Sequence, residues 1–348
     1  ALITALGVTN SIVDFIPSIL LGAPEAGNEL SVLPGHKLLI RGFGYEAIKL
    51  TVVGCVGSVI IVMALLPAMV LAVPALFSVV HPFIYLLLLF IVLLMVLTEV
   101  GIRRVYAALF FLASGAIGLS MDKLPIDSTL LLFPVFSGFF GLSTLMLQLR
   151  TKAKIRPQHF DKIILPARLR NRSILFGSIG GIFAGFLPGV GSSEIATMST
   201  VDKNDRSFLV TLGALTTANI IFSVLALWLI ERTRSGVAVA ISQVAEIGVA
   251  ELLVIISVSV LSVGVAAMAT LKLAKMFVRR LERVNYGFVS KAIILFIILV
   301  AFVFTGFIGL LLLTATASLG LLANLLSVKR GNLMGVLILP TMLFYAGF

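Results

Sequence analysis

The 348-residue chain is 60% hydrophobic and only 12% charged, and its mean hydropathy is +1.18. A soluble core of this size cannot hold so much apolar surface, and apolar runs of about 17–28 residues exclude a β-barrel, whose strands alternate over about ten residues. The formal charge of +11 gathers between the apolar runs, which indicates juxtamembrane charge facing the cytoplasm and anionic membrane lipids rather than nucleic acid. The composition therefore predicts an all-α, polytopic integral membrane protein.

Taken in chain order, ten apolar stretches are long enough to cross a bilayer. They cover roughly residues 3–20, 48–72, 76–100, 104–120, 129–148, 207–230, 248–276, 291–310, 311–327 and 332–348. Two further stretches, 16–35 and 174–193, are apolar but interrupted by proline and glycine. We interpret these two as re-entrant or broken helices, since unwound backbone at membrane depth persists only where protein or a wet cavity satisfies it.

The basic residues predict the orientation of the chain. If both interrupted stretches enter and leave on one face, all the main clusters fall on the same side, which the positive-inside rule assigns to the cytoplasm. These clusters lie at 37–49, 103–104, 150–172, 272–291 and 329–330. We therefore expect a multi-pass protein of the cell membrane with cytoplasmic basic loops. Arg232 and Arg234 fall on the other side, which makes them candidates for a functional role.

An internal repeat divides the chain at its hydrophilic loop, 149–173. Sliding residues 1–148 over 174–348 by 209 positions pairs Ala5 with Ala214 and Asn10 with Asn219. Each copy carries an asparagine-bearing span, a glycine-containing break and four more spans, so the odd number of crossings gives the copies opposite orientation. Such inverted repeats are typical of secondary transporters, with the site at the repeat interface, and on this interpretation an N-terminal hairpin of about 35–40 residues is missing before Ala1.

Polar residues inside the apolar spans are candidates for binding. Asn10 and Asn219 offer an amide donor and acceptor to a ligand, although hydrogen bonding between helices is the alternative. Asp14 lies one helical turn beyond Asn10, and an intramembrane carboxylate predicts a proton relay or a cation ligand. Its alternatives are capping of the helix after Pro17 or an ion pair with a lysine.

Three glycine-containing breaks would expose helix ends and backbone amides to an anion: 22–29, 188–193 and 231–236. A plain surface turn is the alternative for each. We predict Asp14 and Glu25 as ion-coupling residues for H⁺ or Na⁺. The predicted substrate-binding residues are Asn10, Pro24, Gly27, Asn28, Pro188, Gly189, Gly191, Ser192, Ser193, Thr216, Asn219, Arg234, Ser235 and Gly236.

Several enzyme classes are excluded by motif. With three histidines and one cysteine there is no HExxH motif and no cysteine pair, and no GxxxxGK[ST] phosphate loop occurs. The pair Ser192-Ser193 has no histidine in an apolar span to act as its base. We therefore expect no enzyme activity, no cofactor and no metal site.

Two ordered sets of motifs resemble a known family. The first set is DFIPSILLGAP at 14–24, LPGH at 33–36 and GFGYEA at 42–47; the second is FLPGVGS at 186–192, TAN at 217–219 and RSG at 234–236. Together they resemble the archaeal branch of the tripartite tricarboxylate transporter large permease (TctA-like) family over most of the chain, with moderately specific motifs.

The resemblance implies a secondary active transporter for small organic anions of the carboxylate type. Bacterial members of the family work with a small membrane subunit and a soluble binding protein, and we also expect alternating access, ion coupling and a homo-oligomer. The alternative function is a flippase for an anionic lipid carrier such as a polyprenyl phosphate, because the same glycine-rich hairpins would bind a phosphate head group. A membrane enzyme or scaffold would need a catalytic constellation that the sequence lacks.

Overall fold

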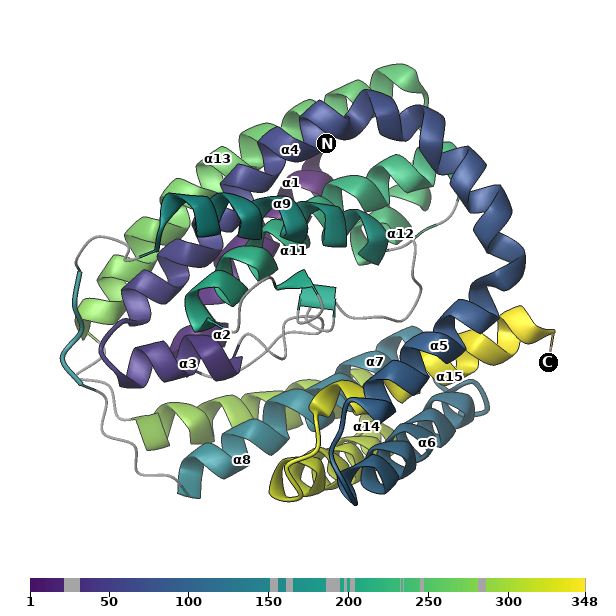
Figure 1. Ribbon diagram of the computed structural model, residues 1–348. Helices are drawn as coiled ribbons and strands as arrows, with labels where there is room; N and C mark the ends of the chain where they lie inside the picture. Colours follow the sequence, from purple (N-terminus) through teal and green to yellow (C-terminus); the bar gives the residue numbers. More distant parts are fainter. Residues whose placement is uncertain are drawn as a thin grey trace.

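The computed structural model describes residues 1–21, 32–150, 156–160, 165–185, 195–196, 199–200, 204–231, 233, 235–244, 247–280 and 286–347. All regular elements in this part of the chain are helical (Figure 1). Seven of the described helical stretches are long and apolar enough to cross a membrane. The prediction of an all-α polytopic membrane protein is therefore confirmed.

The helices form two bundles, each with its own apolar core (Figure 1). The first bundle contains α1 (Leu2–Val13), α2 (Phe15–Leu21), α3 (Val32–Ile40), α4 (Gly44–Val80), α9 (Ala167–Ala184), α11 (Asp205–Ile230), α12 (Gly236–Ser242) and α13 (Val249–Arg280). The second contains α5 (Ile84–Leu97), α6 (Arg103–Met121), α7 (Ser128–Phe136), η3 (Ser137–Leu142), α8 (Ser143–Arg150), α14 (Tyr286–Leu325), η5 (Arg330–Met334) and α15 (Gly335–Ala346).

The long helix α4 connects the two bundles. Its first half packs into the first core, whereas Phe77 and Val80 near its end contact the second core. Through the short turn η2 (His81–Phe83) it continues into α5, giving a helical stretch of 54 residues. Such a stretch is about 80 Å long, far more than one crossing needs. Figure 1 shows α4 curving from one bundle to the other, and the helix contains Pro67 and Pro74, a residue type that bends helices.

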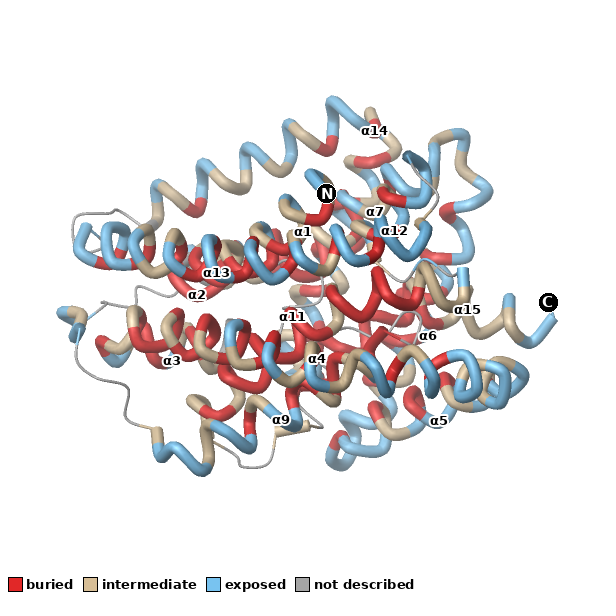
Figure 2. The backbone as a smooth tube through the Cα atoms, turned by 90° about the horizontal axis from the view of Figure 1, so that it is seen from above, coloured by how far each residue is buried: buried red, intermediate tan, exposed pale blue. Residues whose placement is uncertain are grey.

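Helix α11 is the most buried of the candidate membrane-spanning helices (Figure 2), since 83% of its most apolar 18-residue stretch is buried inside the protein. It crosses α4 where both helices carry glycine. A Cβ atom on Gly54 would collide with the carbonyl oxygen of Val210, and one on Gly213 would collide with that of Thr51. Small residues at such crossings let helix backbones approach closely, which is how helices associate where lipid is as apolar as the side chains.

Helix α9 packs against α11 in the same way, through glycines that face backbone carbonyl groups. Gly177 and Gly181 face the carbonyl oxygens of Thr211 and Leu215, so neither position has room for a side chain. A hydrogen bond of 3.0 Å from Ser178 to the buried hydroxyl of Ser58 ties α9 to α4 as well. These contacts join α4, α9 and α11 into one tightly packed unit.

Both interrupted stretches contain chain segments that pack side by side. Gly35 of α3 lies against Ile19 of α2, and the Nδ1 atom of His36 is 3.5 Å from the carbonyl oxygen of Ile19. Burial lowers the pKa of this imidazole, and the hydrogen bond to Ile19 opposes the shift. On the other side, Gly180 of α9 lies against Ile195 and Ser199. The tips of both hairpins lie outside the described residues, and re-entrance into the membrane stays a prediction.

The two expected spans 291–310 and 311–327 are the two arms of α14. The break between them is at Gly306, whose φ of 57° and ψ of −151° are accessible essentially to glycine alone. Beyond the break, Gly320 packs against the carbonyl oxygen of Phe139 in the second bundle. The outer side of the first arm is exposed, with Phe296 and Phe304 both more than 60% accessible.

We expect Gly213→Ala to lower the melting temperature of the protein by several degrees, because a methyl group at this crossing forces α11 away from α4. Overpacking of this kind costs about 1–3 kcal/mol. The matched control is Gly264→Ala on α13, where an added Cβ meets no atom within 4 Å. There the better helix propensity of alanine should leave the melting temperature unchanged or higher. Equal melting temperatures for both variants would contradict the close crossing.

Candidate functional site

Asn219 is a polar residue of the buried helix α11 whose side-chain oxygen lacks a hydrogen-bond partner among the described residues, as do the hydroxyls of Ser207 and Thr211 on the same helix. It is half-buried, near the middle of α11, and its Oδ1 atom is fully buried with no hydrogen-bond donor among the described residues. Its backbone nitrogen lies close to Gly181, so α9 covers this part of α11. Leaving a buried acceptor unsatisfied costs about 1–3 kcal/mol, so the site favours a ligand, an ion or a water that can interact with this oxygen.

The neighbouring threonines differ in their bonding. The hydroxyl of Thr216 donates to the carbonyl oxygen of Leu212 at 2.9 Å. Thr217 is 2% exposed, and its side chain faces the buried thiol of Cys55 on α4. Thr216, Asn219 and Ser223 follow one another at i, i+3 and i+7, a spacing that places them on one face of the helix. This face is a polar stripe in an otherwise apolar span.

On α1 the predicted residues are more accessible. Asn10 is exposed and Asp14 is half-buried. Both backbone polar groups of Asp14 are hydrogen-bonded. Its N–H donates to the carbonyl oxygen of Asn10 at 2.9 Å, and its carbonyl oxygen accepts from the Ser18 hydroxyl at 2.8 Å. The carboxylate Oδ2 lies 3.4 Å from the same hydroxyl. Asn10 and Asn219 differ in burial because α9 covers α11 at this level, while Leu6 on the corresponding face of α1 is 62% exposed.

The end of α11 meets the start of α12 through two hydroxyls. Ser235 caps α12, its Oγ accepting from the backbone N–H of Ala238 at 3.2 Å, and the same atom lies 2.7 Å from Oγ of Ser223. Gly236 is exposed, with open space where a Cβ would be. Ser223 was not among the predicted residues. The i, i+3, i+7 spacing with Thr216 and Asn219 is the signal that could have identified it.

The remaining predicted residues cannot be placed. Outside the described part of the chain lie Pro24, Glu25, Gly27, Asn28, Pro188, Gly189, Gly191, Ser192, Ser193 and Arg234. The described portion of the candidate site therefore comprises Asn10 and Asp14 on α1, Thr216 and Asn219 on α11, and Ser235 with Gly236 at the start of α12. Helices α1 and α11 contact each other within the first bundle, as do α11 and α12.

A buried ion pair holds the starts of α4 and α11 together. Glu46 is 5% exposed and accepts two hydrogen bonds from the guanidinium of Arg206, at 2.9 and 3.2 Å. The same guanidinium lies 5.5 Å from the ring centroid of Phe43. The sequence had no feature that singled out this pair. Both charges are satisfied by each other, so the geometry assigns them to anchoring rather than to ligand binding.

A second polar cluster lies in the other bundle. Glu99 accepts from the backbone N–H of Lys329 at 2.8 Å, and buried Arg330 donates to the hydroxyl of Thr144 at 2.6 Å. Asn332 is 1% exposed and donates to the carbonyl oxygen of Lys329 at 2.9 Å. The charge pattern placed Arg330 in a juxtamembrane basic cluster that faces the cytoplasm. Its burial follows from η5, which carries residues 330–334 into the bundle interior.

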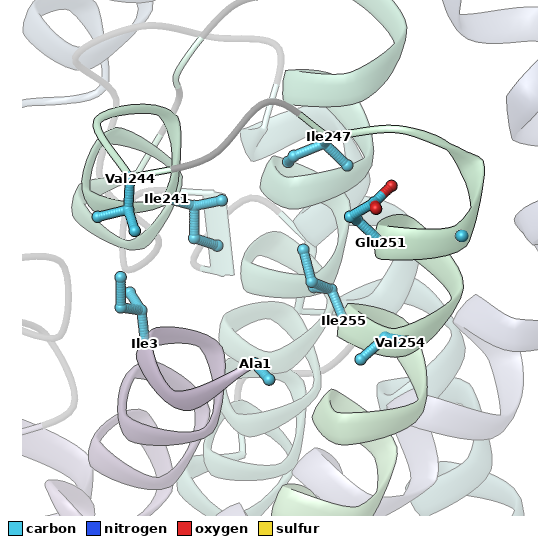
Figure 3. A pocket seen from close by; sticks show the side chains of 9 residues that line it. Ala1, Ile3, Ile241, Val244, Ile247, Glu251, Val254 and Ile255 are labelled. Atoms are coloured by element: carbon cyan, nitrogen blue, oxygen red, sulfur yellow. The ribbon is translucent and has the colours of Figure 1, made fainter.

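A cavity of about 270 Å³ lies between the starts of α1 and α13 and the end of α12 with the residues that follow it (Figure 3). Its walls are mainly aliphatic, and the predicted site residues do not line it. The one carboxylate at its edge, Glu251, accepts from the backbone N–H of Gly248 at 3.0 Å and so caps α13. This cavity suits an apolar group rather than a small anion.

Comparisons with known proteins point in one direction. The model of the tripartite tricarboxylate transporter TctA family matches residues 1–335. An uncharacterized protein from Methanocaldococcus jannaschii is 31% identical over 352 residues, which cover 98% of this chain and 87% of the relative. No solved structure matches the chain.

Arg206→Ala should destabilise the protein by about 3–5 kcal/mol, because it removes the guanidinium from which the buried Glu46 carboxylate accepts two hydrogen bonds. The matched control is Lys37→Ala, which removes a 3.8 Å ion pair with Asp205 in which the lysine is 60% exposed. Exposed pairs contribute about 0–1 kcal/mol, so this control should unfold like wild type. Thermal unfolding in detergent measures both, and the anchoring role is wrong if the two variants lose the same stability.

Proposed function

Because this chain belongs to the tripartite tricarboxylate transporter TctA family, we propose that it is a secondary active transporter carrying small carboxylate-type anions across the cell membrane. Membership establishes a transporter-type permease, and the proposal adds the substrate class, the ion coupling and the mechanism. The observation that carries it is the amide oxygen of Asn219, which is buried without a hydrogen-bond partner among the described residues, on a polar stripe within the most buried spanning helix.

Asn219 is suited to an anion that also carries a hydroxyl or travels with a cation. Its Nδ2 group can donate to a carboxylate, while the buried Oδ1 accepts from a substrate hydroxyl or binds the coupling ion. We propose that Thr216 and Asn10 contribute to the same site. The backbone amides of 188–193 and 24–28, together with Arg234, Ser235 and Gly236, would supply further donors and positive charge.

Ion coupling is assigned to Asp14, with Glu25 as the second candidate. Asp14 is half-buried within a candidate membrane span, and the Ser18 hydroxyl lies 3.4 Å from its carboxylate. We propose that this carboxylate binds the coupling H⁺ or Na⁺, since a carboxylate within a membrane span is a candidate proton relay or cation ligand. Binding of the cation beside the anion would reduce the net charge that has to cross the membrane.

Alternating access would come from movement of one bundle relative to the other. Each bundle has a separate core, and α4, which carries Pro67 and Pro74, runs from one to the other. The inverted repeat fits this division. In the sequence, the offset of 209 aligns residues 2–21 with 211–230 of α11, and α4 with most of α13. All of these elements lie in the first bundle. The same offset places α5 and α6 over the two arms of α14 in the second bundle.

The expected partners follow from the family and from the charge pattern. The family usually includes a soluble binding protein and a small membrane subunit, and we propose that this chain works with one or both, and as a homo-oligomer. We propose that the basic loops face the cytoplasm and its anionic lipids.

A lipid-linked phosphate carrier is the second candidate substrate. The observation in its favour is the aliphatic cavity in Figure 3, which could hold an isoprenoid or acyl chain beside α1. A small soluble anion has no apolar group that could fill such a cavity. The two candidates therefore differ in whether the ligand has an apolar tail.

A thermal-shift screen should show stabilisation of the purified protein by a mono-, di- or tricarboxylate, increased by Na⁺ or by lower pH if the co-ion is a cation. A ligand at 100 times its dissociation constant adds about 2.7 kcal/mol to stability. Stabilisation by a polyprenyl phosphate alone would favour the flippase. If neither ligand class raises the melting temperature, the proposed transporter site is contradicted.

Asn219→Ala should abolish carboxylate uptake into proteoliposomes while leaving the melting temperature unchanged or higher, because it removes an unsatisfied buried amide. The matched control is Asn324→Ala on α14. That amide is also half-buried, but it donates to the carbonyl oxygen of Gly320 at 2.9 Å and lies outside the site. Uptake should survive in the control, and unaffected uptake in Asn219→Ala would remove Asn219 from the site.

A further inference from the structure

Residues 156–160, which we call the strap, lie on the turn between α3 and α4. The turn is formed by Gly42, whose φ of 94° favours glycine. A Cβ atom at this position would meet the carbonyl oxygen of Pro157 at 2.7 Å, so the strap lies directly on the backbone of the turn. The N–H of His159 donates to the carbonyl oxygen of Gly42 at 2.8 Å. Two residues 117 positions apart in the sequence are thus held together.

The side chain of Gln158 bonds to both helices that the turn joins. Its Nε2 donates at 2.9 Å to the carbonyl oxygen of Leu39 in the last turn of α3, and its Oε1 accepts at 2.9 Å from the N–H of Gly44, the first residue of α4. Nε2 also donates to the carbonyl oxygen of Arg156, which orients the amide. Phe43 provides no side-chain cap for α4. One amide from the strap therefore serves the ends of two helices, whose terminal backbone groups lack partners within the helix.

Aromatic contacts hold the strap on the same turn. The ring of His159 stacks on Phe43 with a centroid distance of 5.4 Å, and the rings of Phe160 and Tyr45 are 5.3 Å apart. The guanidinium of Arg279, at the end of α13, lies 5.7 Å from the centroid of Phe160. The strap residues are nevertheless mostly exposed. A segment held by a few exposed contacts opens at a lower free energy than the buried core.

Helix α3 passes the position of the strap on to α2, which packs beside it (Figure 1). The Nδ1 atom of His36 on α3 lies 3.5 Å from the carbonyl oxygen of Ile19 on α2. A Cβ atom on Gly35 would lie 2.7 Å from the Ile19 side chain, so the two helices are in close contact. Ile19 follows Ser18, whose hydroxyl lies 3.4 Å from the carboxylate of Asp14. Contiguous contacts therefore run from the strap to the carboxylate proposed for ion coupling.

We propose that Gln158 is a positioning residue, which fixes α3 and thereby holds α2 so that Ser18 and Asp14 keep the geometry that binds the coupling cation. The inference rests on the proposed function, because it gives the strap a role in the ion coupling assigned to Asp14. The strap belongs to the connection between α8 in the second bundle and α9 in the first, so movement of one bundle against the other acts on it. Release of the strap loosens α3 and lowers the affinity for the cation.

The test compares Gln158→Ala and Gln158→Glu with wild type in the purified full-length protein. Glutamate keeps an acceptor for the N–H of Gly44 but cannot donate to Leu39 when ionised, so it separates the bond to α4 from the bond to α3. Gln243→Ala is the matched control, since it removes the same amide from an exposed position at the end of α12.

Two measurements are made on each variant, with the melting temperature as the check on folding. Hydrogen exchange followed by mass spectrometry reports the backbone amides of 156–160, 42–46 and 15–21. Uptake of radiolabelled citrate and succinate into proteoliposomes, at varied Na⁺ concentration and pH, gives the cation requirement and the KM for the anion separately.

In Gln158→Ala we expect exchange in all three segments to rise about tenfold, the effect of one lost hydrogen bond. The concentration of Na⁺ or H⁺ that gives half-maximal uptake should rise several-fold, with the KM for the anion unchanged. Gln158→Glu should show the same rise in 15–21 and in the cation requirement while the amide of Gly44 stays protected. Gln243→Ala should behave as wild type in both measurements.

Faster exchange confined to 42–46 and 156–160 would reduce Gln158 to a structural cap and overturn the inference. So would an unchanged cation requirement in a protein that takes up either anion, or wild-type exchange in 15–21 of Gln158→Glu. If wild type takes up neither anion, the proposed function fails and the role in ion coupling fails with it. Exchange in 15–21 then still decides whether the strap holds α2 in place.

Discussion

Contact between the backbones of α4, α9 and α11 is the constraint on which the rest of the structure depends. Lipid gives apolar side chains no reason to prefer protein over membrane, so the helices associate through close packing and a few hydrogen bonds. Glycines at 54, 177, 181 and 213 allow that approach, and each faces a carbonyl oxygen of a neighbouring helix. The approach buries α11 on nearly all sides, which is why a polar group on that helix can be left without water.

The buried polar groups of the first bundle are of two kinds. Glu46 and Arg206 satisfy each other, and the hydroxyls of Ser58 and Ser178 do the same, so these pairs stabilise helix contacts. The amide oxygen of Asn219 has no partner among the described residues. An unsatisfied group lowers stability, and its persistence in the most buried helix is explained if a substrate or an ion satisfies it during transport.

The division into bundles does not follow the division of the sequence. Each half of the sequence contributes its first helices to one bundle and its last helices to the other, so that α4 and α13 lie in the first bundle while α5 and α14 lie in the second. In the alternating access that we propose, one bundle would move against the other, with both halves of the chain contributing to the proposed site. The proline-containing helix α4, which connects the bundles, would accommodate that movement.

The sequence by itself determined the fold class and the family, because run lengths, Gly-Pro breaks and ordered motifs are local properties of the chain. It also located most of the long apolar helices, but the predicted span 332–348 contains α15, which has only 12 residues and is not among the candidate membrane spans. It also identified Asn219, since an amide in a long apolar span is visible without a structure. Only the tertiary structure distinguished half-buried Asn219 from exposed Asn10. It also showed that Arg330 is buried and donates to Thr144, and that Ser223 lies next to Ser235. The physical reason is that lipid-facing and protein-facing sides of these helices are equally apolar. Periodicity therefore cannot tell which side is covered, and that is decided by the packing of helices distant in the sequence.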